Sequence, residues 1–396
     1  MKLLVELADE IVSFPRHQSQ HTGGFVLDNR KLTRLVPVEP ARMEHRTIIQ
    51  WDKYDLDMLS LMKVDVLGLG ILTCIRKTLE LVNAFRGTAL RMQDIPAEDP
   101  KVYDMLCQAD TIGLFQVESR AQMARLPTLK PRTFYDLVIE VAIVRPGPIK
   151  GGMVHPYLNR RAGREPITYP SEEIKHILER TLGVTIFQEQ VMAIAIAAAG
   201  FTPGEADQLR RAMAAWKRKG GLEPFKEKLI NGMLARGYQQ SYAEQIFEMV
   251  KGFGDYGFPE SHAASFALLV YVSAWLKCYE PAAYAAGLLN SQPLGFYSPA
   301  QIIYDAQRHG VEVVPVDVLK SDDYSKLVPD TKHQPAIQLG LKSVKGLSED
   351  GAARVVAARN QYTFVDLHDL KQRAQLTMKD MNALADADTF VTLAGH

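Results

Sequence analysis

The sequence predicts a mainly α-helical protein with a small mixed α/β part near its N-terminus. Three observations lead to this fold class. Helical spacing of apolar residues dominates residues 86–325, short strand-like segments gather within residues 1–70, and residues 336–396 read as a smaller helical unit. The chain has 396 residues, 47% of them hydrophobic and 23% charged. These values are ordinary for globular proteins, which excludes a largely disordered chain, and the length predicts two or three domains.

The charge balance and the cysteine content exclude several classes of protein. Lys and Arg number 46 and Asp and Glu number 46, so the formal net charge is zero and a histone-like basic protein is excluded. Local basic patches can still bind nucleic acid. The three cysteines, Cys74, Cys107 and Cys278, form no C-x-x-C pair, which argues against a zinc ribbon or a redox dithiol. So few thiols are typical of a reducing cytosol.

Nothing in the sequence predicts export or contact with a membrane. Residues 1–10 carry acidic side chains where a signal peptide needs an apolar run. The longest uncharged apolar-rich stretch, residues 263–276, is shorter than the roughly 20 residues of a membrane span, and Ser265 and Ser273 interrupt it. We therefore expect a cytoplasmic protein.

Residues 1–70 alternate between helical and strand patterns. Helices are predicted over residues 2–14 and 71–85, and strands over residues 25–27, 47–50 and 62–67. In the last strand, alternation places Lys63 and Asp65 on one face. Gly68 and Gly70 end that strand before the next helix begins.

Residues 86–325 are predominantly helical. Prolines between residues 127 and 170 divide the first part into short elements. Longer helices are predicted over residues 188–199, 204–217, 221–237, 241–252 and 261–278, and a β-rich segment over residues 311–318.

Residues 336–396 have the layout of a helix–hairpin–helix. Lys345-Gly346-Leu347-Ser348 forms a tight turn before an Ala-rich helix over residues 351–359. The first N–H groups of such a helix point outward, so Lys345, Gly346 and Ser348 are candidates to hold a DNA phosphate through the backbone.

Asp65 is the first candidate for chemistry. An acid on an otherwise apolar strand is costly to bury unless it is paired or binds a cation. Lys63 lies on the same face, two residues away. Two interpretations stay open: a local ion pair at a strand end, or a Mg²⁺ ligand beside a lysine that meets a phosphate.

Asp55-Leu56-Asp57 has the spacing of the paired carboxylates of a two-metal site. It follows Trp51-Asp52-Lys53-Tyr54 in a polar stretch, where acids ordinarily open a helix. We interpret Asp55 or Asp57 as an N-cap.

Two basic stretches are candidates for binding a polyanion. Residues 145–164 contain Arg145, Lys150, Arg160, Arg161 and Arg164 and no acid. Residues 205–236 contain eight basic and four acidic side chains. Arg210 and Arg211 lie about 100° apart on a helix, so both can reach one polyanion. A solvated helix face is the alternative for either stretch.

Two further stretches open apolar helices. Gln188-Glu189-Gln190 is interpreted as a polar first turn. In Tyr256-Gly257-Phe258-Pro259-Glu260-Ser261-His262, Ser261 is interpreted as an N-cap and His262 as a hydrogen-bonded structural residue. No catalytic triad order, H-E-x-x-H, P-loop or dinucleotide fingerprint stands out.

Taken in order, these stretches resemble the bacterial C-family DNA polymerases, the family of the DNA polymerase III alpha subunit. The residues that carry the resemblance are His21-Thr22-Gly23-Gly24, Val64-Asp65-Val66-Leu67-Gly68-Leu69, Gly113-Leu114-Phe115-Gln116-Val117-Glu118-Ser119-Arg120, Arg145-Pro146-Gly147-Pro148, Gln188-Glu189-Gln190-Val191-Met192, Leu209-Arg210-Arg211-Ala212-Met213, Tyr256-Gly257-Phe258 and Ser261-His262. Each motif is weak alone, whereas the ordered set is highly specific.

Within this family the chain looks most like the error-prone branch. The residues that indicate it are Ser13-Phe14-Pro15-Arg16-His17, Ile49-Gln50-Trp51-Asp52-Lys53, Pro259-Glu260, and residues 290–299 from Asn290 to Pro299. Replicative members usually carry a different pair before Ser261-His262.

The resemblance implies both a division of the chain and roles for single residues. Residues 1–70 would be the C-terminal part of the palm, residues 71–325 the fingers, and residues 326–396 the beginning of the tandem helix–hairpin–helix DNA-binding region. Asp65 would be catalytic and would bind Mg²⁺. The nucleotide would be bound by Lys63, Arg210, Arg211, Ser261 and His262. DNA would be contacted by Arg145, Lys345, Gly346 and Ser348.

The resemblance also implies that parts of the polymerase are missing. The family's palm uses three acids, and Asp65 matches the third, whereas the first two belong to a D-x-D motif well upstream. The nucleotide-binding Gly-Ser motif, the thumb and the N-terminal PHP domain have no counterpart either. We therefore expect a fragment of a longer polymerase that is inactive alone.

The full protein would add dNTPs to a primer 3′-OH on a template by two-metal nucleotidyl transfer, in damage-induced mutagenesis and translesion synthesis. Its partners would be primer–template DNA and, for the full protein, a sliding clamp or other mutagenesis-complex proteins. The alternatives are a fragment of a replicative alpha subunit, a non-catalytic DNA-binding truncation product, and a helix–hairpin–helix repair enzyme such as a glycosylase, for which Lys371 and Asp380 are available.

Overall fold

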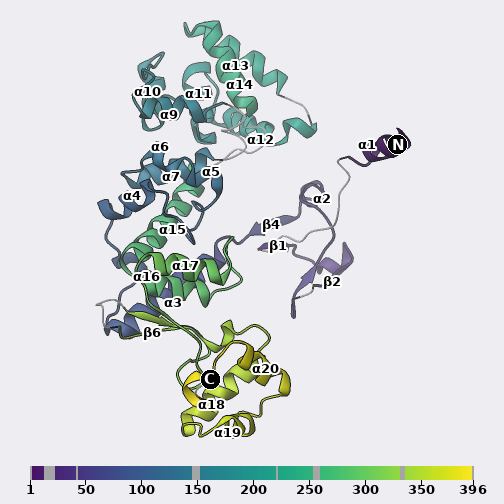
Figure 1. Cartoon of the computed structure of the whole chain (residues 1–396). Helices are drawn as coiled ribbons and strands as arrows, with labels where there is room; N and C mark the ends of the chain where they lie inside the picture. The colour runs from purple at the N-terminus through teal and green to yellow at the C-terminus, as the bar shows by residue number, and fades with distance from the viewer. Residues whose placement is uncertain are drawn as a thin grey trace. The chain divides into compact units, whose positions relative to one another are not determined.

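Helices make up most of the structure, as the sequence predicts (Figure 1). The computed structural model describes residues 2–12, 23–41, 43–144, 152–219, 222–252, 259–330 and 335–394. Contacts between Cα atoms divide the chain into two units, Met1–Leu69 and Gly70–His396. Among the described residues, no helix is both long and apolar enough to cross a membrane.

The first unit contains short elements and two small antiparallel sheets. Its elements are α1 (Lys2–Glu10), β1 (Gly24–Leu27), η1 (Leu32–Arg34), β2 (Glu39–Pro40), β3 (Thr47–Ile48), α2 (Lys53–Met58) and β4 (Met62–Asp65). β1 pairs with β4, with Gly24 opposite Asp65 and Val26 opposite Lys63, and β2 pairs with β3. The predicted strands are confirmed, although β4 ends at Asp65 rather than continuing to residue 67.

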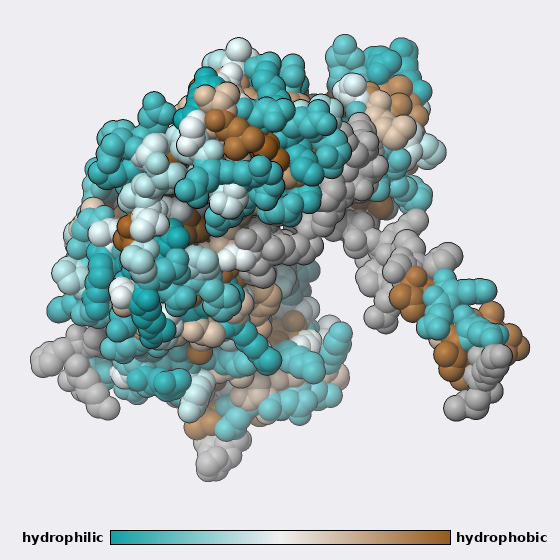
Figure 2. Space-filling view, turned by 90° about the horizontal axis from the view of Figure 1, so that it is seen from above, coloured by the Kyte–Doolittle hydropathy of each residue, from teal (hydrophilic) through white to brown (hydrophobic). Residues whose placement is uncertain are grey.

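Apolar side chains of this unit lie largely on its surface. Leu3 and Leu4 of α1 are each 66% exposed, and Figure 2 shows the apolar surface of that helix. All four residues of β4 are exposed, so neither face of that strand is covered. A small two-stranded sheet can bury a face only if a helix or another sheet packs against it. Among the described residues no such layer covers β4, so the alternation in its sequence produces no buried side.

The second unit begins with the helices that the sequence places in residues 71–325. They are α3 (Leu69–Arg86), η2 (Met92–Asp94), α4 (Pro100–Cys107), α5 (Arg120–Met123), α6 (Leu126–Leu129), α7 (Phe134–Ile143), α9 (Val154–Arg161), α10 (Glu172–Leu178), η3 (Glu179–Thr181), α11 (Gln188–Ala199), α12 (Pro203–Lys219), α13 (Glu223–Ala235), α14 (Gln240–Gly252), α15 (Glu260–Tyr279), α16 (Pro281–Leu289) and α17 (Pro299–Arg308). The boundaries of α11 coincide with the predicted range, because Gly200 ends it in a left-handed conformation at φ 71°.

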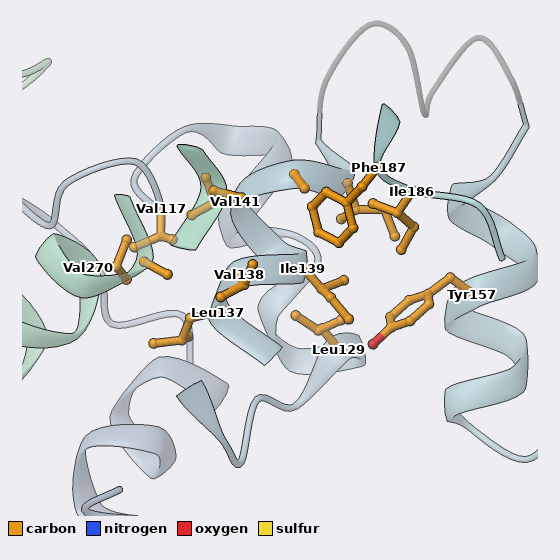
Figure 3. Close-up of a cluster of buried hydrophobic side chains, with 14 of the residues drawn as sticks. Val117, Leu129, Leu137, Val138, Ile139, Val141, Tyr157, Ile186, Phe187 and Val270 are labelled. Atoms are coloured by element: carbon orange, nitrogen blue, oxygen red, sulfur yellow. The ribbon is translucent and has the colours of Figure 1, made fainter. Parts of the chain in front are cut away.

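The core of these helices is built around α7. Every residue of α7 from Asp136 to Ile143 is buried. Figure 3 shows Leu137 and Val138 of α7 next to Val270 of α15, while Ile139 lies toward Tyr157 of α9. Because α7 is buried along this whole stretch, it contacts helices on several sides at once.

A three-stranded sheet and a second hydrophobic cluster complete the chain. Strands β5 (Val313–Val314), β7 (Ala336–Gln338) and β6 (Lys326–Val328) lie in that order, with β5 parallel and β6 antiparallel to β7. The predicted β-rich segment 311–318 thus contributes only the two residues of β5. The remaining elements are η5 (Leu341–Ser343), α18 (Glu349–Gln361), α19 (Leu367–Arg373), α20 (Met378–Asp386) and α21 (Val391–Ala394), and they surround Leu341, Val355, Leu370 and Leu384.

Gly340 marks a close backbone approach at the entry to η5. A Cβ at this position would lie 2.3 Å from the carbonyl carbon of Tyr324 and 2.5 Å from the Ser325 nitrogen. Both neighbours are backbone atoms that cannot move aside, so only glycine fits there. The loop that carries Tyr324 is therefore held directly against the segment that leads into the hairpin.

Candidate nucleotide and DNA contact sites

Asp65 and Lys63 lie side by side at the exposed end of β4. The Lys63 ammonium is 3.1 Å from a carboxylate oxygen of Asp65, whose side chain is 40% exposed. The local ion pair, one of the two interpretations of these residues, is therefore present, and it does not decide whether Asp65 also binds a metal. An exposed ion pair contributes little to stability, so this pair alone does not explain why an acid stands at this position.

The described residues provide one carboxylate for a metal at this position, not a complete two-metal site. Two Mg²⁺ ions about 4 Å apart need several bridging carboxylates, and Asp65 can supply only one. Asp55 and Asp52 have another role at the start of α2: each carboxylate accepts a hydrogen bond from the other residue's backbone N–H, at 3.0 and 3.1 Å. This is a reciprocal capping box, so the interpretation of the Asp55–Asp57 stretch as a helix start is correct, with Asp52 rather than Asp55 or Asp57 as the cap.

A second acidic group, in the helical unit, has metal-like spacing but already holds a cation. Ligand atoms of Asp110, Asp305 and His309 lie within 4.8 Å of one another. The Lys277 ammonium is 2.9 Å from a carboxylate oxygen of each aspartate and 3.0 Å from the carbonyl of Ile112. Because this buried ammonium already pairs with both carboxylates, we interpret the group as a structural ion cluster.

Arg210 and Arg211 converge on one carboxylate. Arg210 donates from Nε and Nη2 to one oxygen of Asp207, at 2.9 and 2.8 Å, and Arg211 Nη2 lies 2.8 Å from the other oxygen. Hydrogen bonds from Arg210, and then the charge of Arg211, lower the pKa of Asp207. The two guanidinium groups of α12 can therefore engage one anionic group together, as expected from their spacing.

The other predicted basic residues are mostly committed to structure. Arg160 donates to Glu165 and to the carbonyl of Leu182, both at 2.9 Å. Arg161 is ion-paired with Asp136 at 2.5 Å. Residues 145–164 are thus not a free basic surface over this part of their length. Arg145 and Lys150 lie outside the described residues.

The first turn of α15 is held by three other elements. Tyr135 of α7 donates its hydroxyl proton to Glu260 at 2.6 Å, and Arg180 of η3 lies 3.4 Å from the same carboxylate oxygen. The Arg180 guanidinium also lies 3.9 Å from the centre of the Tyr135 ring. Glu189 of α11 accepts the backbone N–H of Glu260 at 3.1 Å. Sequence reasoning missed this network, because its partners lie far apart in the chain.

Ser261 and His262 occupy this first turn. The N-cap is Pro259, so the prediction of Ser261 as the cap is wrong. The helix begins earlier, at Glu260, because the side chain and the backbone N–H of Glu260 are both held by other elements. The His262 ring lies 4.3 Å from that of Phe266, centre to centre. Tyr256-Gly257-Phe258 lies outside the described residues.

The predicted hairpin is present before α18. Gly346 has φ +92°, a conformation that favours glycine. Ser348 is the N-cap of α18 and its hydroxyl accepts the Gly351 N–H at 3.0 Å. In the described part of the chain, the backbone N–H groups of Lys345 and Gly346 donate no hydrogen bond, whereas those of Leu347 and Ser348 do. The amides open to a phosphate are therefore those of Lys345 and Gly346.

Lys371 and Asp380, the residues considered for a repair-enzyme activity, have structural surroundings. The carboxylate of Asp380 accepts four hydrogen bonds from Ser348 and Thr377. The Lys371 ammonium lies 3.2 Å from the sulfur of Met378. Asp380 is 2% exposed, so it is poorly placed to attack a substrate. A glycosylase-like site at this pair is not supported.

Three family models match successive parts of the chain. Residues 1–68 match the Bacterial DNA polymerase III alpha NTPase domain, and residues 71–237 match the Bacterial DNA polymerase III alpha subunit finger domain. Residues 310–396 match a Helix-hairpin-helix motif.

Curated relatives match the chain over nearly its whole length. Proteins named Error-prone DNA polymerase are 60% identical in Alkalilimnicola ehrlichii and 58% identical in Pseudomonas fluorescens and Bordetella bronchiseptica. These alignments cover 99%, 100% and 99% of this chain, but only 38%, 39% and 37% of the respective relatives. The chain therefore spans well under half the length of the relatives it matches.

Proposed function

Because this chain belongs to the family of bacterial DNA polymerase III alpha subunits, we propose that it serves in an error-prone DNA polymerase acting in damage-induced mutagenesis and translesion synthesis. The observation that carries the proposal is the 60% identity, over 99% of the chain, to a protein named Error-prone DNA polymerase. Residues 1–70 would contribute to the palm, residues 71–325 would form the fingers, and residues 326–396 would bind DNA through the helix–hairpin–helix.

The reaction would transfer a nucleotidyl group from a dNTP to a primer 3′-OH. Mg²⁺ ions bound by carboxylates lower the pKa of the attacking hydroxyl and stabilise the leaving pyrophosphate. Asp65 would hold one such ion together with acids from outside this sequence. Lys63, 3.1 Å from Asp65, would neutralise charge on the triphosphate.

The fingers would contribute the remaining nucleotide contacts. Arg210 and Arg211 already direct their guanidinium groups onto one carboxylate, that of Asp207, and a triphosphate offers oxygens of the same kind. Ser261 and His262 lie in the first turn of a long helix, where the helix dipole favours an anion.

Primer–template DNA would be held without sequence preference. The free amides of Lys345 and Gly346 would contact a backbone phosphate, with Ser348 fixing the turn and Arg145 adding a contact from the fingers. In the cell the full protein would act in the cytoplasm, with a sliding clamp or other mutagenesis-complex proteins as partners.

Asp65→Asn in a polymerase carrying the complete palm tests the central assignment. An amide is nearly isosteric with a carboxylate but cannot balance a metal charge, so kcat should fall by well over tenfold with the fold retained. Asp57→Asn, in exposed α2, is the matched control and should extend primers like the wild type. A loss below tenfold, about 1.4 kcal/mol, would leave Asp65 as a structural partner of Lys63. The 396-residue chain alone should not extend a primer.

A further inference from the structure

Two lysines from distant parts of the helical unit meet at one exposed tyrosine. Tyr324 is 47% exposed, in the loop before β6. The Lys77 ammonium of α3 lies 4.7 Å from the centre of its ring, and the Lys342 ammonium of η5 lies 4.4 Å from it. Lys342 is also 3.2 Å from the Tyr324 hydroxyl. Both contacts have the geometry of cation–π interactions.

The backbone around this tyrosine is fixed from two sides. The side-chain amide of Asn290, at the end of α16, pairs with both the N–H and the carbonyl of Ser325, each at 2.8 Å. Gly340 packs against the backbone of Tyr324 on the other side. The Lys77 ammonium additionally donates to the carbonyl of Asn290. These positions are therefore ordered before any ligand binds, which lowers the entropic cost of binding.

The two ammonium groups have partners other than carboxylates. Several other described lysines, among them Lys63, Lys228 and Lys251, are ion-paired with carboxylates. In the described residues, Lys77 and Lys342 form no such pair; their partners are a carbonyl, a hydroxyl and an aromatic ring. Asp323 and Glu349 are near enough to Lys342 to act on its charge, but only beyond salt-bridge distance.

Two ammonium groups therefore lie at Tyr324 without a carboxylate of the described residues in salt-bridge contact with either. The two ammonium groups cannot be further apart than the sum of their distances to the shared ring centre, an upper limit that slightly exceeds the Debye length of about 8 Å at physiological ionic strength. Within that limit they repel each other, more strongly the closer they lie and the lower the salt concentration, and an anion between or beside them would offset the repulsion.

The location of the pair relates it to the hairpin. Lys342 belongs to η5, which leads directly into the turn at residues 344–348. That turn presents the free amides of Lys345 and Gly346. A DNA strand carries one phosphate per about 3.4 Å of helix axis, so a strand held at the turn has further phosphates within reach of neighbouring cations.

We propose that Lys77, Tyr324 and Lys342 form a second phosphate-backbone contact for duplex DNA, which extends the hairpin contact onto helix α3. The contact recognises phosphate charge and not base sequence, because the ammonium groups and the tyrosine would contact the DNA backbone and not the edges of the bases. The inference rests on the proposed DNA binding of the hairpin region.

The test measures binding of the full 396-residue chain to a fluorescently labelled blunt duplex across a salt series. Each of Lys77→Ala and Lys342→Ala should lower affinity and reduce the slope of log K against log salt by about one unit. Between about 50 and about 200 mM salt, the loss of one phosphate contact should reduce the ratio of wild-type affinity to variant affinity by about threefold. The double variant should lose about two units, and Lys→Arg at both positions should restore the slope.

Lys251→Ala is the matched control. Lys251 also lies over an aromatic ring, 5.5 Å from the centre of Phe247, but it is ion-paired with Glu248 at 2.7 Å. Its removal should leave affinity and slope unchanged, and thermal unfolding should confirm that every variant is folded. A wild-type chain that binds the duplex, with a folded double variant of unchanged affinity and slope, would overturn this inference alone. A wild-type chain that does not bind duplex DNA at any salt would overturn the proposed hairpin contact as well.

Discussion

Asp380 accepts hydrogen bonds from both the backbone N–H and the hydroxyl of Ser348, 32 positions earlier, at 3.1 and 2.9 Å. Its other carboxylate oxygen accepts from the N–H and the hydroxyl of Thr377, at 3.2 and 2.8 Å. Ser348 and Thr377 are the N-caps of α18 and α20. One carboxylate therefore stabilises the start of two helices and links the hairpin turn to α20.

Asp380→Ala should destabilise the C-terminal helices by about 2 kcal/mol, because each lost capping interaction costs about 1 kcal/mol. Denaturant unfolding of the chain, followed by a probe in residues 341–394, measures the loss. Asp386→Ala, an exposed acid at the end of the same helix, is the control and should change stability by less than about 0.5 kcal/mol. Equal stability of the two variants would contradict the double-capping role.

Acid titration provides a second readout of the same carboxylate. Burial alone would raise the pKa of Asp380, but the hydrogen bonds from Ser348 and Thr377 outweigh it and lower the pKa from 3.8 to about 2. A carboxylate with a depressed folded-state pKa contributes stability above its unfolded pKa and loses it as the pH falls. The wild type should therefore lose stability between pH 4 and pH 2 more steeply than Asp380→Ala.

Gly346→Ala should weaken duplex binding about equally for all sequences. A Cβ at Gly346 would be 3.6 Å from that of Ala383, an ordinary contact, so the cost comes from the positive φ and from obstruction of the open amides. Gly310, with φ +77° and nothing within 4 Å of its Cβ position, is a matched control. Both alanine variants should lose about 1 to 2 kcal/mol of stability, but only Gly346→Ala should change DNA affinity. Unchanged affinity in a folded Gly346→Ala chain would make this hairpin a packing element.

Single helices and turns could be predicted from the sequence because apolar periodicity and turn residues are read within a few neighbouring positions. Apolar periodicity predicted the limits of α11, and the Lys345–Ser348 turn precedes its helix as expected. A second, equivalent turn before α20 was missed. Gln375 there has φ +49° in the place of Gly346, and Thr377 caps the helix in the place of Ser348. A turn without glycine carries no sequence signal of that conformation.

In the candidate site too, contacts between residues close in sequence could be predicted, whereas contacts between distant residues could not. Lys63 and Asp65 are two residues apart on a strand, and alternation was enough to place them together. Glu260 meets Tyr135, 125 residues earlier, through tertiary packing that no local pattern encodes. The wrong assignment of the α15 cap to Ser261 follows from this, since the contacts of Glu260 decide where that helix begins.

Lys277→Met should cost about 3 to 5 kcal/mol, the range for removing one partner of a buried ion pair. The side chain of Lys277 is 3% exposed, and its loss would leave Asp110 and Asp305 facing each other without their shared cation. Denaturant unfolding measures the effect. Lys175→Met, which removes an exposed lysine paired with Glu172, should cost less than about 1 kcal/mol. A small loss for Lys277→Met would mean that the aspartates are satisfied by other groups.

The same ion cluster should make stability depend on pH above neutrality. A hydrogen bond to Asp110 raises the pKa of His309 above 6.5, against the opposing effect of burial. A raised folded-state pKa gives stability that is fully present below pH 6.5 and is lost as the pH rises through the folded-state pKa. The difference in unfolding free energy between pH 6 and pH 8.5 should therefore shrink in His309→Gln. An identical pH profile in the variant would show that the imidazole stays neutral in the fold.

Arg210→Ala and Arg211→Ala should raise KM for dNTP in a polymerase carrying the complete palm. Both guanidinium groups already converge on the Asp207 carboxylate, so both should reach one triphosphate. Primer–template affinity should stay nearly unchanged, which a binding titration checks separately from steady-state kinetics. If either variant instead weakens DNA binding and flattens its salt slope by about one unit, that arginine contacts the DNA backbone.

Glu260→Ala should loosen the first turn of α15 and raise KM for dNTP, because that turn carries Ser261 and His262. The variant leaves the Tyr135 hydroxyl without its acceptor at 2.6 Å and the Arg180 guanidinium without its carboxylate. Losing the acceptor of a partly buried hydroxyl costs about 1 to 3 kcal/mol. Glu260→Gln is the matched control: its amide oxygen can still accept from Tyr135, and the lost ion pair involves an Arg180 side chain that is 62% exposed, so it should behave nearly like the wild type. Steady-state kinetics of the complete polymerase and denaturant unfolding of the chain, measured on both variants, separate the two contributions. If Glu260→Ala loses stability but keeps the wild-type KM, the network supports the fold of the fingers and has no part in holding the nucleotide.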